Sequence, residues 1–433
     1  MKKHALLIGA AGLIGIIGSV MLWRSTGPSK KNVPQAVAPA APPVAPDIPP
    51  NKPKPKPSPA RAEIVGWLKN GSATYPEATP PIKWNSNENV LWWSEVGHGY
   101  SSPIVNGNRV IVASEPDTVI SVDIQNGKHQ WSTQLPPSSL PEDQKDKVLP
   151  MPGEAGNTAA TPSSDGERVY VVFAIGIVAA LDIKTGKVAW TQVIGSDRTT
   201  GDGRSGSPVR IGDLLIVHLS ELYAFEAATG KIRWKQQDAE DAYGTPVATT
   251  INDEDVLLLP KGMVVRVSDG KILTTLNASL QFSSPRVFGR KACYMDHSFS
   301  IFELPDKILD SKQQVTEYWT GSIAEDVYTT PLFHEGYLYT ITQSGKLIIL
   351  DLMNKIKIEK QFELQENVYP SPVLAGKYIY FGDDKGKTII IEPGKEANVV
   401  GINELSEGSG GTPAFSGNKI FIRSGELLYC MGK

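Results

Sequence analysis

The stretch from Thr161 to Trp190 reads TPSSDGERVYVVFAIGIVAALDIKTGKVAW, and it decides the fold. A strand entered at Pro162 needs no backbone donor at its first residue, and a polar turn follows at Asp165-Gly166. A second strand comes next, then a third that ends at Asp182 and a fourth closed by the tryptophan. A Thr-Gly-Lys turn joins the last two strands, because its glycine supplies the positive φ that tight hairpins need. The stretch therefore predicts one four-stranded antiparallel sheet.

The Ser/Thr-Pro pair that opens this stretch recurs along the chain. It stands at Ser102-Pro103, Thr161-Pro162, Ser207-Pro208, Thr245-Pro246, Ser284-Pro285, Thr330-Pro331, Ser371-Pro372 and Thr412-Pro413. The gaps between successive prolines are 59, 46, 38, 39, 46, 41 and 41 residues, which is the period expected of propeller blades. We therefore predict an all-β fold, an eight-bladed β-propeller of four-stranded blades. Seven blades is the alternative, if one degenerate repeat is an insertion.

The last repeat is incomplete. After Thr412 the sequence holds three apolar strands and then stops, so the fourth strand is missing. A matching segment with a tryptophan, 89–94, stands ahead of the first repeat. We predict that this N-terminal strand closes the last blade, because a closed ring leaves no long unpaired sheet edge.

The repeats carry a second signature, Ala/Val-x-Asp-x-x-Thr-Gly-Lys-x-x-Trp after Ser/Thr-Pro-Val-Val. Over roughly residues 81–433 this pattern resembles the PQQ-like (quinoprotein-type) β-propeller repeat family. The resemblance implies that the tryptophans ending the fourth strands, Trp93, Trp131, Trp190 and Trp234, dock neighbouring blades. It also implies two functional branches. One contains PQQ-dependent dehydrogenases, and the other contains cofactor-free propellers such as the BamB-like lipoproteins of the outer-membrane β-barrel assembly machine.

The dehydrogenase branch implies a quinone in the central channel, a Ca²⁺ held by oxygen ligands, a carboxylate base and a pair of adjacent cysteines. This chain has two cysteines, Cys293 and Cys430, which are far apart in sequence. Both stand in apolar strands, so we predict two buried free thiols rather than a disulfide.

Other catalytic patterns are also missing from the sequence. The six histidines show no zinc-ligand spacing, and no Gly-x-Ser-x-Gly elbow is present. Five acidic loop residues follow no recognisable ligand spacing and are interpreted as solvated charges, although the sequence leaves their convergence on the axis open. They are Asp202, Asp241, Asp326, Asp383 and Asp384. We predict no catalytic residue, no cofactor and no metal, with PQQ and Ca²⁺ as an unsupported alternative.

The N-terminal region differs in character from the repeats. An apolar run from Ala5 to Trp23 is about 28 Å long as a helix, enough to cross a bilayer. We interpret residues 1–24 as an uncleaved signal anchor, a transmembrane helix, with a removed signal peptide as the alternative. Residues 25–62 are rich in Pro, Ala and Lys and predict a disordered, extended linker, and 63–433 form the propeller. This places the propeller on the periplasmic side of the inner membrane in a bacterial cell envelope.

Charge is divided unevenly between these regions. Residues 1–62 contain nine basic residues and one acidic residue, whereas the rest contains 34 basic and 45 acidic residues. The propeller therefore has a net charge of −11. Because attraction to phosphates dominates nucleic-acid binding, we predict no nucleic-acid partner.

An aromatic residue stands three positions before the repeat proline in five of the eight blades: Tyr100, Tyr243, Phe282, Tyr328 and Tyr369. These positions fall in the loops that lead into the innermost strands, with His98, Asp326 and Asp383 close by. A ring of aromatics at this rim would bind an extended peptide or a sugar. The alternative is inter-blade packing, repeated because the blades repeat.

The leading functional prediction is a membrane-tethered, non-catalytic scaffold, monomeric and BamB-like, whose partners are envelope or outer-membrane proteins. The alternatives are a PQQ-dependent quinoprotein oxidoreductase and a peptide- or carbohydrate-binding sensor module. An insertion between blades one and two, 136–157, is either a recognition loop or a tolerated surface insertion.

Overall fold

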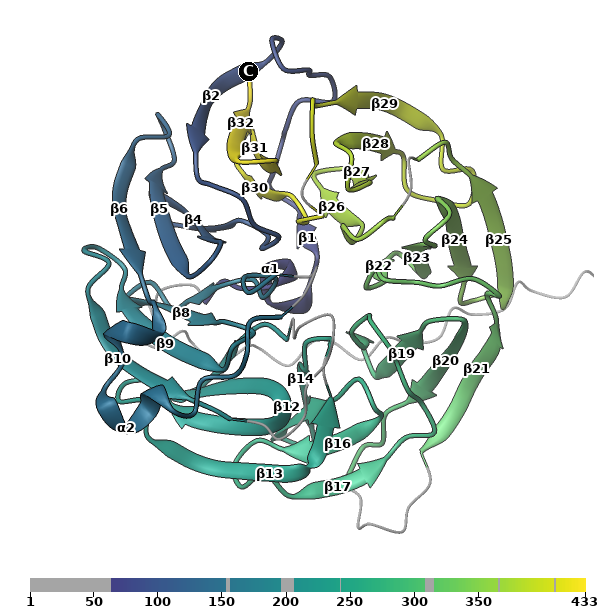
Figure 1. Ribbon diagram of the computed structural model, residues 1–433. Helices are drawn as coiled ribbons and strands as arrows, with labels where there is room; N and C mark the ends of the chain where they lie inside the picture. Colours follow the sequence, from purple (N-terminus) through teal and green to yellow (C-terminus); the bar gives the residue numbers. More distant parts are fainter. Residues whose placement is uncertain are drawn as a thin grey trace, which may run out of the picture. The chain divides into compact units, whose positions relative to one another are not determined.

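Eight small antiparallel sheets surround a central axis (Figure 1). The computed structural model describes residues 64–152, 156–195, 206–241, 243–307, 315–364, 367–408 and 410–433, all within one unit, Ser58–Lys433. Eight blades are confirmed, and the seven-bladed alternative is wrong. The predicted signal anchor and linker lie outside the described residues. Within the part of the chain that the structure describes, no helix is long and apolar enough to span a membrane.

Five blades contain four strands in simple order from the axis outward. Blade 1 holds β3 (Ile104–Asn106), β4 (Arg109–Ser114), β5 (Thr118–Asp123) and β6 (His129–Gln134). Blade 2 holds β7 (Ser163–Ser164), β8 (Arg168–Val172), β9 (Ile177–Asp182) and β10 (Val188–Val193). Blade 4 holds β14 (Val247–Ile251), β15 (Glu254–Leu258), β16 (Met263–Arg266) and β17 (Ile272–Thr275). Blade 5 holds β18 (Arg286–Phe288), β19 (Lys291–Met295), β20 (Ser298–Glu303) and β21 (Thr316–Ser322). Blade 6 holds β22 (Leu332–His334), β23 (Tyr337–Ile341), β24 (Lys346–Asp351) and β25 (Ile356–Gln361).

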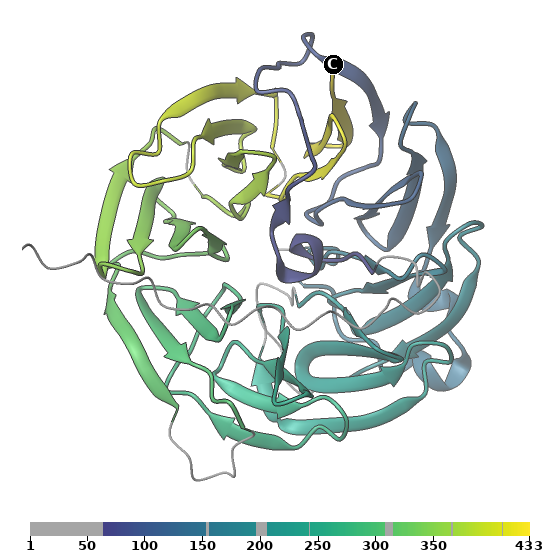
Figure 2. The same cartoon turned by 180° about the vertical axis from the view of Figure 1, so that it is seen from behind.

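The other three blades depart from this plan. Blade 3 holds β11 (Val209–Ile211), β12 (Leu214–Glu226) and β13 (Ile232–Asp241), and β12 contains both middle strands of the repeat. Blade 7 holds β26 (Val373–Ala375), β27 (Tyr378–Gly382), β28 (Lys387–Ile391) and β29 (Val399–Glu404), with β1 (Thr74–Tyr75) added at the axis. Blade 8 holds β30 (Ala414–Ser416), β31 (Lys419–Ser424), β32 (Leu427–Met431) and, outermost, β2 (Val90–Glu95). The predicted closure by an N-terminal strand is thus confirmed (Figure 2).

The recurring Ser/Thr-Pro phrase has a direct structural role. In every blade the backbone N–H of the Ser or Thr donates a hydrogen bond to the hydroxyl oxygen of the Ser or Thr in the next blade, at 2.8–3.3 Å. The last bond, from Thr412 to Ser102, closes the ring at 2.9 Å. The hydroxyl group of Ser or Thr supplies this acceptor. This explains why the Ser/Thr-Pro pair occurs in all eight repeats, whereas the Thr-Gly-Lys turn does not.

The outer ring is docked by tryptophan in half of the blades. The Trp131 Nε1–H donates to the Ile183 carbonyl at 2.8 Å, and the indole lies on Gly186, where an added Cβ would be 2.7 Å from the ring. The same arrangement recurs between blades 2 and 3 and between blades 3 and 4. There Trp190 and Trp234 donate to the carbonyls of Ala227 and Val267.

Trp93 does not occupy the docking position predicted for it, because its side chain is 56% exposed. Trp92 is buried instead and donates to the Ile124 carbonyl at 3.2 Å. A bulge between Val90 and Trp92 gives Trp92 the register that Trp131 and Trp190 have in their strands. Because successive side chains of a strand point to opposite faces, Trp93 faces away from the neighbouring blade.

The hydrophobic core lies mainly between adjacent blades, where strand residues of neighbouring sheets form shared clusters. Cys293 on β19 and Cys430 on β32 are both buried and free, which confirms the prediction of two buried thiols. Burial raises the pKa of both thiols, that of Cys430 to about 12.

Residues 64–79 form a plug in the central channel, and this was not predicted. Val65 bridges to Ser164 of blade 2, and β1 pairs in parallel with β26 of blade 7. Between them, α1 (Leu68–Gly71) is one left-handed turn with positive φ at each of its residues. Both views place α1 and β1 at the centre of the ring (Figures 1 and 2). The chain then leaves toward blade 7, where Trp84 is buried and its backbone N–H donates to the Asn403 side-chain oxygen at 2.7 Å.

The insertion between blades 1 and 2 carries two short helices, η1 (Pro137–Ser139) and α2 (Glu142–Lys145). Its end is fixed to blade 1, because the Glu115 carboxylate accepts the backbone N–H groups of Asn157 and Thr158, each at 2.8 Å. Whether the insertion recognises a partner stays a prediction.

Candidate binding site at the mouth of the channel

Four aromatic side chains form a continuous arc across blades 4 to 7. Tyr243 and Phe282 have ring centroids 5.5 Å apart, Phe282 and Tyr328 meet edge to face at 4.8 Å, and Tyr328 and Tyr369 stack at 5.3 Å. Each stands two residues before a Ser or Thr of the hydrogen-bonded ring, so the arc follows that ring at the entrance to the innermost strands. Tyr369 is 46% exposed and the other three rings are half-buried. We call these four residues the aromatic arc.

Tyr100 and His98 form a separate pair. Their rings meet edge to face at 5.2 Å, and the His98 Nε2 lies 3.3 Å from the Tyr100 hydroxyl. The position equivalent to Tyr100 is Ala159 in the loop before blade 2 and Gly410 in the loop before blade 8. These small residues separate the pair from the arc. The structure therefore brings together four of the six predicted rim residues.

Carboxylates flank the arc on blades 5 and 6. The Asp326 carboxylate lies 2.9 Å from His297 Nδ1. The Asp296 carboxylate accepts a hydrogen bond from the Gln281 backbone N–H at 2.9 Å. Burial and the two nearby carboxylates together raise the pKa of the Tyr328 hydroxyl. The mouth at this side is therefore aromatic and negatively charged.

Asp383 and Asp384, the other acidic candidates whose side chains the structure describes, are not part of this cluster. Asp383 is buried and accepts the backbone N–H groups of Lys385 and Lys387, so it stabilises its own turn. Asp202 lies outside the described residues, as does the side chain of Asp241.

A metal site was not predicted, and the residues at the mouth do not suit Ca²⁺. Asp296, His297 and Asp326 bring three ligand atoms within 4.8 Å of one another. Ca²⁺ takes six to eight oxygen ligands, and this group offers two carboxylates and an imidazole on an exposed rim. It does not match the oxygen cage that the quinoprotein resemblance implies.

The channel itself does not suit a quinone cofactor either. The described innermost strands present no carboxylate after the repeat prolines; the residues there are Ile104, Ser163, Val209, Val247, Arg286, Leu332, Val373 and Ala414. The one charged member, Arg286, is buried and donates to the Ser72 carbonyl of the plug at 2.7 Å. At these eight described positions there is no carboxylate base, and Ser163 has the only side-chain oxygen that could bind Ca²⁺. We therefore derive no reaction through PQQ.

Two features of the site were missed in the sequence. Asp296 and His297 stand in the turn between β19 and β20, and only the fold brings them beside a loop 30 residues away. The sequence did contain a signal for the plug. Four apolar residues lie between the predicted linker and the closing strand and belong to neither segment: Val65, Trp67, Leu68 and Tyr75.

Comparison with known families shows that this ring is similar to PQQ-like propellers. A family model described as "Outer membrane protein assembly factor BamB" matches residues 81–252, which hold the closing strand, blades 1 to 3 and the first strand of blade 4. The predicted resemblance to the PQQ-like repeat family, closest in character to BamB-like propellers, is confirmed.

Two curated relatives represent both branches of this resemblance. Outer membrane protein assembly factor BamB of Moranella endobia is 26% identical over 216 residues, 45% of this chain and 54% of the relative. Quinohemoprotein alcohol dehydrogenase ADH IIB of Pseudomonas putida is 26% identical over 185 residues, 39% of this chain and 26% of the relative. The chain thus spans about half the length of the curated BamB relatives it matches.

Among solved structures, the computationally designed Ika8 protein matches with a TM-score of 0.57 and 11% identity, covering 80% of this chain and all of that one. At this identity the likeness shows the fold alone.

Proposed function

We propose that this chain is a non-catalytic scaffold of the bacterial envelope that holds a partner protein through the aromatic arc. The observation that carries the proposal is the arc itself, four contacting rings in the loops that lead into the innermost strands of blades 4 to 7. Aromatic side chains supply large contact areas at low entropic cost and are enriched in binding hot spots.

The comparisons support this class of function. BamB proteins are named as outer membrane assembly factors, and their family model matches the closing strand, blades 1 to 3 and the first strand of blade 4. By analogy we place the propeller in the envelope, with envelope or outer-membrane proteins as partners. Tethering to the inner membrane through residues 1–24 is part of the proposal and rests on the sequence of that segment.

A quinoprotein oxidoreductase is the second candidate, favoured by the match to the alcohol dehydrogenase of Pseudomonas putida. Two observations argue against this candidate. The residues that begin the innermost strands do not match the ligands that Ca²⁺ and a quinone need, and Cys293 and Cys430 are not adjacent. Dye-linked alcohol oxidation by the chain after incubation with PQQ and Ca²⁺ would establish this candidate in place of the scaffold.

The direct test is partner capture from envelope membranes by the full-length chain and by the triple variant Tyr243→Ala, Tyr328→Ala, Tyr369→Ala. We expect the variant to lose the partners that the unchanged chain retains, because three of the four arc rings are removed. Thermal unfolding measures folding separately.

The matched control is the triple variant Trp93→Ala, Met353→Ala, Ile402→Ala, which removes three exposed apolar side chains away from the mouth. It should capture the same partners as the unchanged chain. Equal capture by both triple variants would refute the arc as the binding surface. Unfolding of the arc variant alone would support the inter-blade packing alternative.

A further inference from the structure

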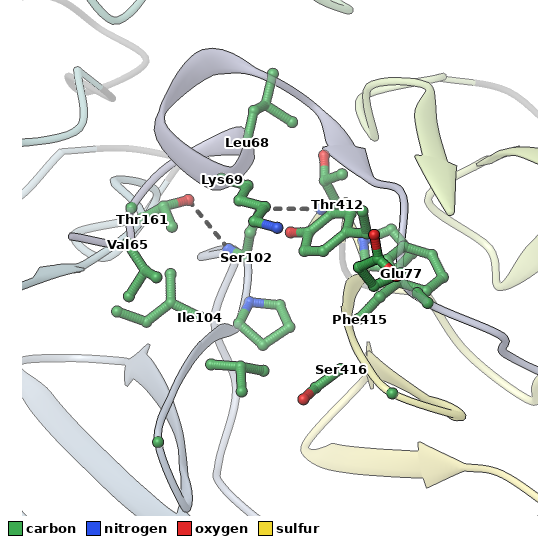
Figure 3. Close-up of a pocket in the computed structure, with 18 residues that line it drawn as sticks. Val65, Leu68, Lys69, Glu77, Ser102, Ile104, Thr161, Thr412, Phe415 and Ser416 are labelled. Carbon is green, nitrogen blue, oxygen red and sulfur yellow. Dashed lines mark hydrogen bonds between the residues drawn. The ribbon is translucent and has the colours of Figure 1, made fainter. Parts of the chain in front are cut away.

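A pocket of about 260 Å³ lies between the plug and the innermost parts of blades 1 and 8. Its walls combine apolar side chains, among them Leu68, Ile104 and Phe415, with hydroxyl and charged groups (Figure 3). It lies on the other side of the hydrogen-bonded ring from the loops that carry the aromatic arc, beside the turns at Gly107 and Gly417.

Three hydroxyls of the Ser/Thr ring line this pocket: Ser102, Thr161 and Thr412. Each hydroxyl oxygen already accepts a backbone N–H from a neighbouring blade, at 2.9–3.3 Å. Among the described residues none of the three donates its own proton to a protein acceptor, so these protons remain for a ligand in the pocket.

Lys69 supplies a positive charge to the same pocket. Lys69 belongs to the lining (Figure 3), and its amine stands 5.0 Å from the centre of the Tyr75 ring. No carboxylate of the described residues lies within ion-pair distance of it. Glu77, the other charged residue of the lining, is exposed at the edge.

The Tyr75 hydroxyl is a fourth donor in the lining. Burial raises the pKa of this hydroxyl, so it stays protonated over the whole physiological range. A half-buried cation and four hydroxyl donors around an apolar floor suit a carboxylate that carries an apolar group.

We propose that this pocket binds a small carboxylate with an apolar tail, either a free organic acid or the C-terminal residue of a peptide. The carboxylate oxygens accept from the Lys69 amine and the ring hydroxyls, and the tail lies against Phe415 and Ile104. The site is independent of the aromatic arc, since it uses other residues and the other side of the ring.

The test uses isothermal titration calorimetry on the full-length chain at low salt, where charge contributes most. The probes are N-acetyl-leucine and its neutral analogue N-acetyl-leucinamide. We expect the acid to bind at least about tenfold more tightly, the usual size of one hydrogen bond to a charged group. A leucine-terminated tetrapeptide and its C-terminal amide then distinguish a peptide end from a free acid.

Variants separate the charge from the fold. Lys69→Met keeps the aliphatic stem and should weaken binding of the acid about tenfold, whereas Lys69→Arg should restore it. The matched control Lys83→Met removes a lysine of the same N-terminal segment that pairs with Glu88 outside the pocket, and it should leave binding unchanged. Equal affinity for acid and amide, unchanged binding in Lys69→Met, or no binding of any probe would overturn the proposal.

Discussion

The two halves of the ring use the same repeat in different ways. From blade 8 to blade 4 each interface is docked by a tryptophan whose indole N–H reaches a carbonyl of the next blade. From blade 4 to blade 7 no tryptophan of the described residues donates such a bond: Trp319 of blade 5 has the docking register but packs edge to face on Phe299 at 4.8 Å. The aromatic arc belongs to this half. The family model matches within the tryptophan-docked half. Under the proposed function, the repeats that keep the tryptophan signature dock the blades, and the repeats that carry the aromatic arc bind the partner.

Docking in the divergent half is still present in a weaker form. Between blades 5 and 6, Tyr318 donates its hydroxyl to the Leu352 carbonyl at 2.9 Å, where a tryptophan would place its indole. A half-buried phenol on an exposed strand buries less area than an indole, so each interface here should depend less on one side chain.

The largest expected effect is on docking. Trp131→Ala should lower the free energy of unfolding by about 3–5 kcal/mol, because it removes a buried indole together with its hydrogen bond. Tyr318→Phe, which removes a hydrogen bond alone, should cost only about 1 kcal/mol. Urea unfolding followed by tryptophan fluorescence and circular dichroism measures both.

The control for this contrast is Trp93→Ala, an exposed residue of the closing strand, which should change stability by less than about 0.5 kcal/mol. If Trp131→Ala and Tyr318→Phe had equal effects, the two halves would not differ in docking.

The next prediction concerns the hydroxyl ring, which both halves share. Ser207→Ala removes the acceptor of the buried Thr161 N–H, and Ser371→Ala removes that of the Thr330 N–H, each at 3.0 Å. Each change should destabilise the fold by about 1–3 kcal/mol, the cost of a buried donor left unpaired. The two values should agree, while the matching serine-to-threonine changes should be nearly neutral. A large difference between the halves would contradict a uniform ring.

The third prediction uses a histidine of the docked half. His218 is buried, its Nε2 lies 2.8 Å from the Ala239 carbonyl, and burial lowers its pKa to about 4. Between pH 6.5 and 4 the unfolded chain takes up a proton that the folded chain does not. Stability should therefore fall with falling pH by about 1 kcal/mol per pH unit in this range.

His218→Gln should flatten this part of the pH profile in urea unfolding measured at pH 7, 5.5 and 4.5. An unaltered slope in His218→Gln would show that other groups cause the acid sensitivity.

The sequence was sufficient for the ring because its signals are local and repeated. The Ser/Thr-Pro phrase, the Thr-Gly-Lys turn and the missing last strand together predicted eight blades and their closure. The prediction that Trp93 docks the neighbouring blade was wrong. Trp92 and Trp93 are adjacent and face opposite sides of the strand, and a bulge between Val90 and Trp92 turns Trp92 toward the docking position.

The candidate site was predictable only in part. Periodicity identified the aromatic positions, but contact between them depends on the angle of each loop, and Gly410 and Ala159 leave Tyr100 apart. The plug was missed because its contacts with blades 2, 5 and 7 are made by residues remote in sequence.

Site-specific photo-crosslinking in intact cells tests the central claim most directly. A benzophenone side chain replaces Tyr369 in the arc in one variant and Trp93 on the closing strand in another. The account predicts a discrete adduct with one envelope protein from the arc position and none of that protein from the closing strand. Adducts of equal yield from both positions, or an adduct from the closing strand alone, would contradict it.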